Sequence, residues 1–190
     1  MGKTALKRAT YDTLLEVPEH LVAELIAGEL YTSPRPAPRH GLASSRLGAR
    51  LGGPFDFGDG GPGGWWVLDE PELHLGDPAP RSVVLVPDIA AWRKERMPEL
   101  PDSAAFTLPP DWICEVLSPS TAPLDRARKL PIYGQAGVRW AWLVDPIART
   151  LEVFRHTEQG WLLLGVHIGD AEVRAEPFDA VVLPLGSLWA

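Results

Sequence analysis

The sequence predicts an α/β fold of the mixed α+β kind, with helices on both faces of a central mixed β-sheet. Residues 112–117 and 140–145 are nearly continuous apolar runs, which are typical of strands buried on both faces. A helical segment lies between these two strands, and a crossover helix of this kind joins parallel neighbours. The chain has 190 residues, 45% of them apolar, which suffices for a buried core. We therefore expect residues 1–190 to form a single domain, with a loose N-terminus over residues 1–11.

The first third of the chain is expected to contain two helices around a short strand. Residues 14–26 are predicted to form the first helix, because Pro18 suits a first turn and four apolar residues after it share one helical face. Residues 29–32 have the pattern of a strand, and residues 39–51 that of a second helix. The glycine-rich residues 52–64 are predicted to form a loop.

From residue 65 onward the sequence favours strands. The first two segments, residues 65–68 and 73–75, are predicted to form one bent strand or a hairpin. A polar insertion over residues 93–110 separates later strands. The remaining expected elements are a buried strand at 82–86, the strand at 112–117, a helix at 121–136 disturbed by Pro131, the strand at 140–145, a hairpin of 151–155 and 161–168, and a last strand at 180–183.

Composition and charge argue against several classes of protein. The net charge of −7 disfavours a protein that coats nucleic acid, because phosphate binding needs a positive surface, although an enzyme can use a local basic rim. Cys114 is the single cysteine, so an intramolecular disulfide is excluded, and we expect a cytoplasmic location. The sequence has no apolar run of membrane-spanning length and no apolar signal region, so we expect no membrane partner.

Two acids occupy positions that should be buried. Asp88 follows the apolar residues 83–86, and Glu115 interrupts the strand at 112–117. A carboxylate inside a core is costly unless donors or a cation compensate it. Each acid alone could cap a loop or pair with an arginine, whereas together they could share a divalent cation. Oxygen-only ligands favour Mg²⁺ or Mn²⁺.

Further charged residues could complete such a site. Asp125 and Lys129 are four apart on the predicted crossover helix, so they share one face. They could form a surface ion pair, or Lys129 could lean over the strand end and stabilise a developing phosphorane charge or orient a water. Glu24 and Glu29 could approach a metal or could be solvated acids.

Basic residues gather around the start of the second predicted helix. Arg35, Arg39 and His40 lie there, followed by Arg46 and Arg50. Such a patch is either a solvated face or an approach for phosphate groups. The tryptophans of the predicted strands are expected to be core residues rather than platforms for base stacking.

These segments together resemble the Uma-two family, whose members are described as restriction endonucleases. The resemblance extends over about residues 12–185, in the order of the family. Its most specific string is Glu-Val-Leu-Ser-Pro-Ser-Thr at residues 115–121. The other positions that carry it are residues 23–30, His40, residues 86–89, Asp125, Lys129, Tyr133, residues 137–138 and residues 142–146.

The resemblance implies the restriction endonuclease-like fold of PD-(D/E)xK nucleases, a central mixed sheet flanked by helices with metal-binding acids on adjacent strands. Asp88 would be the acid of the PD motif, and Glu115 the acid of (D/E)xK. Leu117 stands where that motif has lysine, and the resemblance implies that Lys129 takes its place from the helix. Glu24 resembles the N-terminal helix acid that some of these nucleases add to the metal site.

The implied activity is that of a metal-dependent endonuclease that hydrolyses phosphodiester bonds in DNA. Asp88, Glu115 and the backbone carbonyl of Val116 would hold one or two Mg²⁺ ions, or Mn²⁺, which would activate a water and polarise the phosphate. Lys129 would position or deprotonate that water, or offset charge in the transition state.

Arg35, Arg39 and His40 would line the approach of the phosphate. Two alternatives stay open: a catalytically inactive module of the same fold that serves binding or assembly, and a metal phosphohydrolase that acts on small nucleotides. Nucleases of this fold often dimerise, so a homodimer or a higher homo-oligomer is a further expectation, with apolar residues 161–164 at the contact.

Overall fold

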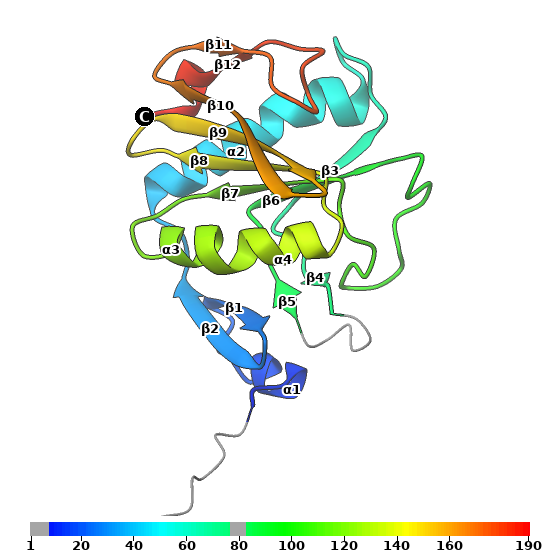
Figure 1. Ribbon diagram of the computed structural model, residues 1–190, viewed down its shortest axis with the longest axis vertical. Helices are drawn as coiled ribbons and strands as arrows, with labels where there is room; N and C mark the ends of the chain where they lie inside the picture. The colour runs from blue at the N-terminus through cyan, green and yellow to red at the C-terminus, as the bar shows by residue number, and fades with distance from the viewer. Residues whose placement is uncertain (1–7, 77–82) are drawn as a thin grey trace, which may run out of the picture.

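The computed structural model, which describes residues 8–76 and 83–190, confirms the predicted mixed architecture (Figure 1). Its centre is a six-stranded sheet. From one edge to the other the strands are β10 (Gly160–Ile168), β9 (Thr150–Thr157), β8 (Trp140–Asp145), β7 (Trp112–Val116), β6 (Ile89–Arg93) and β3 (Trp65–Asp69). β7 and β8 are parallel, as predicted, and the other neighbours are antiparallel.

The connection between β7 and β8 is helical. It consists of α3 (Ala122–Leu124), the π-helical segment η3 (Asp125–Lys129) and α4 (Leu130–Gln135). Pro131 has no N–H with which to close an α-helical hydrogen bond, and the wider η3 turn lies directly before α4. The helix predicted for residues 121–136, with its disturbance at Pro131, is confirmed.

Helices cover both faces of the six-stranded sheet (Figure 1). Side chains alternate along β7, so that Trp112 packs in the core beneath α2 (Pro38–Leu51), and Ile113 packs in the core beneath α4 with Tyr133. Glu115 shares the face of Ile113 and therefore points toward the α4 layer. The buried tryptophans of the predicted strands are Trp65, Trp112, Trp140 and Trp142, and Trp66 is partly buried.

A smaller four-stranded antiparallel sheet adjoins the main sheet and lies below it in Figure 1. Its strand order is β2 (Glu29–Pro34), β1 (Leu21–Ile26), β5 (Val84–Leu85) and β4 (Leu73–His74). Buried side chains of both sheets share one core, which includes Ile26, Leu85 and Ile113. The boundary between the two sheets is thus packed, and residues of β1 can reach the end of β7.

The helix predicted for residues 14–26 is wrong. Only α1 (Tyr11–Leu15) is helical, and β1 follows it. The apolar spacing fits both structures, and the strand is preferred because β1 pairs with β2 along its whole length and with Val84 on its other side. A two-residue turn joins β1 to β2, in which Ala27 and Gly28 have φ angles of 53° and 82°.

Two predictions around β3 also need correction. Residues 52–64 are not a loop throughout, because Gly52–Phe57 forms the π-helical segment η1, which continues α2 and buries Phe55. Residues 65–68 and 73–75 form neither one bent strand nor a hairpin. β3 belongs to the six-stranded sheet, whereas β4 belongs to the four-stranded sheet.

Strand boundaries differ from prediction at three further places. The strand predicted for residues 82–86 is reduced to β5, with Ser82 outside the described residues. β6 escapes sequence-based prediction because two alanines at its centre give a weak strand signal. The last strand, predicted at residues 180–183, lies instead at β12 (Leu183–Pro184), paired with β11 (Glu172–Val173). The predicted hairpin is confirmed as β9 and β10.

The N-terminal prediction falls largely outside the described residues, which begin at residue 8. Ala9 donates its backbone N–H to the carbonyl of Gly28 at 2.9 Å, and α1 begins at Tyr11. The single-domain organisation stays a prediction. Within the described ranges, no helix combines the length and the apolar character that crossing a lipid bilayer requires.

Candidate active site

Asp88 and Glu115 come together at one end of the six-stranded sheet. Asp88 lies directly before β6, and Glu115 is the fourth residue of β7, which pairs with β6 through Ile89 and Cys114. Asp88 follows the buried strand β5, as predicted, and also directly precedes β6, so it lies at the start of the strand next to the one that carries Glu115. Both line a cavity of about 340 Å³, whose walls also include Glu24, His40, Val116 and Lys129.

The ammonium of Lys129 lies among three carboxylates in this cavity. Its Nζ atom is 2.8 Å from Glu115 Oε1, 2.9 Å from Glu24 Oε1 and 3.4 Å from Asp125 Oδ1. The Lys129 side chain is only 4% exposed, so the alternative of a surface ion pair with Asp125 is wrong. Lys129 lies instead against the carboxylate of Glu115, from a position on the crossover helix.

Glu115 and Glu24 each accept a hydrogen bond from a second donor. The Tyr133 hydroxyl donates a hydrogen bond to Glu115 Oε1 at 2.7 Å, and the Val86 backbone N–H donates to Glu24 Oε1 at 2.9 Å. Tyr133 follows Lys129 by four residues, so both project from one face of the helix. This helical spacing is the signal that could have assigned Tyr133 a role from the sequence.

Glu24 reaches the cavity from a different element than predicted. It lies on β1 rather than on an N-terminal helix, and it is buried. The four-stranded sheet therefore supplies part of the cavity wall, together with Ser33 and Arg35 at the end of β2. Glu29, the other acid considered, pairs with Arg128 at the surface.

Burial and charge shift the pKa values of the cluster. Burial raises the pKa of Glu115 well above its ordinary value, although the ammonium of Lys129 opposes the shift, and burial likewise raises the pKa of Asp125. Burial by itself would lower the pKa of Lys129. The negative charges of Glu115 and Glu24 outweigh burial and raise that pKa well above its ordinary value, so Lys129 is a cation at neutral pH.

The cluster holds more negative than positive charge among its described residues. Its carboxylates are those of Glu24, Asp88, Glu115 and Asp125. The ammonium of Lys129 neutralises one of them, and a protonated His40 would neutralise a second. Since unpaired charge is costly in a buried site, the remaining excess requires bound protons or an additional cation.

His40 lies against Asp88 rather than only along the approach to it. Its Nε2 atom is 3.3 Å from Asp88 Oδ1, and Asp88 Oδ2 accepts the backbone N–H of Val116 at 2.7 Å. Burial alone would lower the pKa of His40, but the hydrogen bond and charge of Asp88 and a backbone contact with Val116 raise it. The other ring nitrogen, Nδ1, is buried and has no hydrogen-bond partner among the described residues.

The two arginines predicted to line the phosphate approach differ in position. Arg35 lines the cavity, with 58% of its side chain exposed, and its guanidinium is 3.4 Å from the carboxylate of Glu70. Arg39 is exposed on α2 next to His40 but does not line the cavity. The structure thus brings Arg35 and His40 to the site and leaves Arg39 outside it.

The oxygen donors of the cavity fit a magnesium-type ion. In residues 8–76 and 83–190, no three His, Cys, Asp or Glu side chains are grouped so that they could hold a metal by themselves. Asp88 and Glu115 offer two carboxylates, and Val116, which also lines the cavity, has a backbone carbonyl. Mg²⁺ commonly uses one or two carboxylates and takes its other ligands from water and substrate phosphate.

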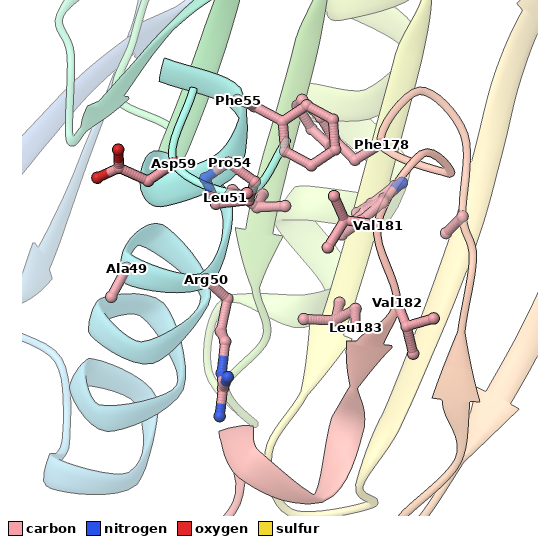
Figure 2. A pocket seen from close by; sticks show the side chains of 13 residues that line it. Ala49, Arg50, Leu51, Pro54, Phe55, Asp59, Phe178, Val181, Val182 and Leu183 are labelled. Atoms are coloured by element: carbon pink, nitrogen blue, oxygen red, sulfur yellow. The ribbon is translucent and has the colours of Figure 1, made fainter. Parts of the chain in front are cut away.

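A second cavity, of about 260 Å³, lies between the C-terminal end of α2, η1 and residues 175–183 (Figure 2). Phe55 and Phe178 pack together at its wall, with ring centroids 4.7 Å apart. Its charged lining residues are Arg50 and Asp59. It contains no carboxylate–lysine cluster, so the chemistry favours the cavity at Asp88 as the candidate active site.

The mixed α+β fold is shared with a solved structure. The chain is similar to a crystal structure described as "a putative nuclease belonging to DUF820" from Anabaena variabilis ATCC 29413, with a TM-score of 0.73. The sequence identity is 24%, and the match covers 94% of this chain and 96% of that chain. At this identity the likeness shows the fold alone.

The family model described as "Uma2: Putative restriction endonuclease" matches residues 9–186. The chain therefore belongs to this family, and the resemblance predicted from the sequence is confirmed. A comparison with curated proteins gave no match. The roles of the individual site residues stay predictions.

Proposed function

We propose that the chain is a metal-dependent endonuclease that hydrolyses phosphodiester bonds in DNA at the cavity of Asp88. The observation that carries this proposal is the charge cluster: Lys129 Nζ lies 2.8 Å from Glu115 Oε1 in a cavity that Asp88 also lines, and carboxylates outnumber cations there. Such an excess is what a divalent cation would neutralise. Membership in a family of restriction endonucleases supports DNA as the substrate.

Asp88, Glu115 and the backbone carbonyl of Val116 would hold Mg²⁺ or Mn²⁺. A bound ion of this kind lowers the pKa of a coordinated water and polarises a phosphate oxygen. Glu24 would approach the ion only through its second carboxylate oxygen, because Oε1 already contacts Lys129 and accepts a backbone N–H. We therefore assign Glu24 mainly to holding Lys129.

Lys129 acts as a cation and not as a general base. In the chain without metal, the negative charges of Glu115 and Glu24 raise the pKa of Lys129 well above its ordinary value. This favours the ammonium form, which has no lone pair with which to accept a proton from water. This charge would stabilise the negative charge that develops on the phosphate oxygens in the transition state. It also fixes the Glu115 carboxylate, which it contacts directly.

His40 and Arg35 would guide the substrate phosphate. His40 already donates toward one carboxylate, at Asp88, and it lines the cavity. Arg35 pairs with Glu70 in an exposed position, so a phosphate can replace Glu70 as its partner at little cost. Arg39, exposed on α2, would contact a flanking phosphate outside the cavity.

The test is the nicking of supercoiled plasmid in the presence of Mg²⁺ or Mn²⁺. We expect the intact chain to nick the plasmid, and Asp88→Ala and Lys129→Ala to lower the rate by at least about 100-fold. Asp59→Ala is the matched control, because Asp59 lines the other cavity. Nicking that persists in both site variants would contradict the proposal and would point to a contaminant.

One observation favours a second candidate function. Leu117 stands where the motif has lysine, and it is buried, so no cation of this strand can reach the acids. A chain that binds plasmid but fails to nick it with either metal would be an inactive binding or assembly module. The phosphohydrolase alternative predicts release of phosphate from a panel of nucleotides without plasmid nicking.

A further inference from the structure

The two oxygens of the Glu115 carboxylate have different surroundings. Oε1 accepts the hydrogen bond of the Tyr133 hydroxyl at 2.7 Å and lies 2.8 Å from Lys129 Nζ. Both of these contacts converge on the same oxygen. Glu115 itself lines the cavity, whereas Tyr133 does not, so Tyr133 acts on the site through residues that line it, and its hydrogen bond is to Glu115.

We infer that Tyr133 is a positioning residue, which together with Lys129 holds Glu115 Oε1 and so leaves Oε2 as the oxygen that binds the metal ion. This inference rests on the proposed function. A carboxylate with one oxygen held by two donors has a fixed plane, and a fixed plane presents the free oxygen in one direction.

The hydroxyl of Tyr133 distinguishes this residue from an ordinary core residue. Its ring is fully buried in the core beneath α4, where a phenylalanine would fill nearly the same volume. The hydroxyl therefore adds a buried polar group that must find a partner, and Glu115 is that partner. Because Lys129 already compensates the charge of Glu115 at Oε1, orientation of the carboxylate accounts for the additional hydroxyl better than charge compensation does.

The spacing of Lys129 and Tyr133 along the helix makes this role possible. Tyr133 lies four residues after Lys129, so that one helical face delivers both donors to the same strand position on β7. The two donors reach Glu115 from successive turns. Groups that orient a metal ligand in this way typically account for about 10- to 100-fold in metal affinity.

The experiment measures Mn²⁺ binding by the full chain, with free Mn²⁺ monitored by electron paramagnetic resonance. We expect Tyr133→Phe to weaken binding at least about 10-fold, with a smaller loss of thermal stability than Lys129→Met causes, because Lys129 still compensates Glu115. The matched control is Tyr31→Phe, which also removes a phenol–carboxylate hydrogen bond, to Glu29 on the exposed hairpin of β1 and β2. This control should bind Mn²⁺ as the unmodified chain does.

The outcomes separate this inference from the proposed function. Equal Mn²⁺ affinity in Tyr133→Phe and in the unmodified chain would overturn the inference alone. Absence of Mn²⁺ binding by the unmodified chain would overturn the metal-dependent function and the inference with it. Should Tyr133→Phe fail to fold, 4-aminophenylalanine at position 133 keeps a donor and should keep the affinity, whereas 4-fluorophenylalanine should lose it. Equal affinity for these two chains would again overturn the inference.

Discussion

At the scale of single residues, the central feature is one ammonium among buried carboxylates. Lys129 contacts Glu24, Glu115 and Asp125, and all four side chains are nearly inaccessible to water. Removing one partner from a buried ionic cluster leaves the others uncompensated, which is far more costly than losing an exposed ion pair. The stability of the chain without metal should therefore depend strongly on Lys129.

We predict that Lys129→Met lowers the free energy of unfolding by about 3–5 kcal/mol, measured by urea denaturation in the presence of a chelator. Arg128→Met is the matched control, because Arg128 is the preceding residue but pairs with the exposed Glu29. This control should change stability by less than about 1 kcal/mol. Similar effects of the two substitutions would contradict the assignment of Lys129 to a buried cluster.

The same residues show what a sequence can reveal about a site. Asp88 and Glu115 stand out because a carboxylate next to or within an apolar run must have a compensating partner, and the structure brings both to one cavity. The contact between His40 and Asp88 has no comparable signal, because forty-eight positions separate the two residues and only the packing of α2 brings them together. Distances of this kind depend on tertiary structure, which residue spacing does not encode.

At the scale of elements, β1 shows where local pattern fails. Its apolar residues fit a helical face as well as a strand. The strand forms because its backbone pairs with β2 on one side and with Val84 on the other, and a helical pattern does not reveal these partners. The long, strongly apolar strands β7 and β8 and the crossover between them were predictable, because burial on both faces leaves a continuous signal. The misassigned β1 is the element that delivers Glu24 to the cavity.

The turn between β1 and β2 gives a prediction for this element. Ala27 has a φ of 53°, a left-handed conformation that glycine adopts without strain. We expect Ala27→Gly to raise the free energy of unfolding by about 0.5–1 kcal/mol.

Gly28→Ala should lower the free energy of unfolding, since φ is 82° at this position and an added Cβ would lie 3.1 Å from the side chain of Arg8. Thermal unfolding measures both, and a gain from Gly28→Ala would contradict the geometry of the turn.

At the scale of the whole molecule, the candidate site is a meeting point of distant segments. β1 contributes Glu24, α2 contributes His40, the start of β6 contributes Asp88, and the crossover helix contributes Lys129. The four-stranded sheet is therefore a wall of the site and not an appendage. The general architecture follows from the order of apolar strands and helices, but the assembly of this cavity requires the packing of two sheets.

One edge strand of the main sheet carries the residues expected to form the contact of a homo-oligomer. β10 is one edge strand, and it exposes Leu162, Leu163 and Val166 to solvent. Trp161, by contrast, donates its indole N–H to the carbonyl of Leu130 at 2.8 Å and is partly covered. The apolar contact expected at residues 161–164 would thus be made by the leucines, and the oligomeric state stays a prediction.

The proposed site requires Asp88 and Glu115 to bind a common divalent ion beside Lys129. A crystal soaked in Mn²⁺ and measured by anomalous diffraction would locate such an ion. We expect an anomalous peak within bonding distance of one oxygen of Asp88 and one of Glu115, with the His40–Asp88 contact rearranged around it. A Mn²⁺ peak only at surface acids, with that contact and the Glu115–Lys129 pair unchanged, would contradict the proposed site.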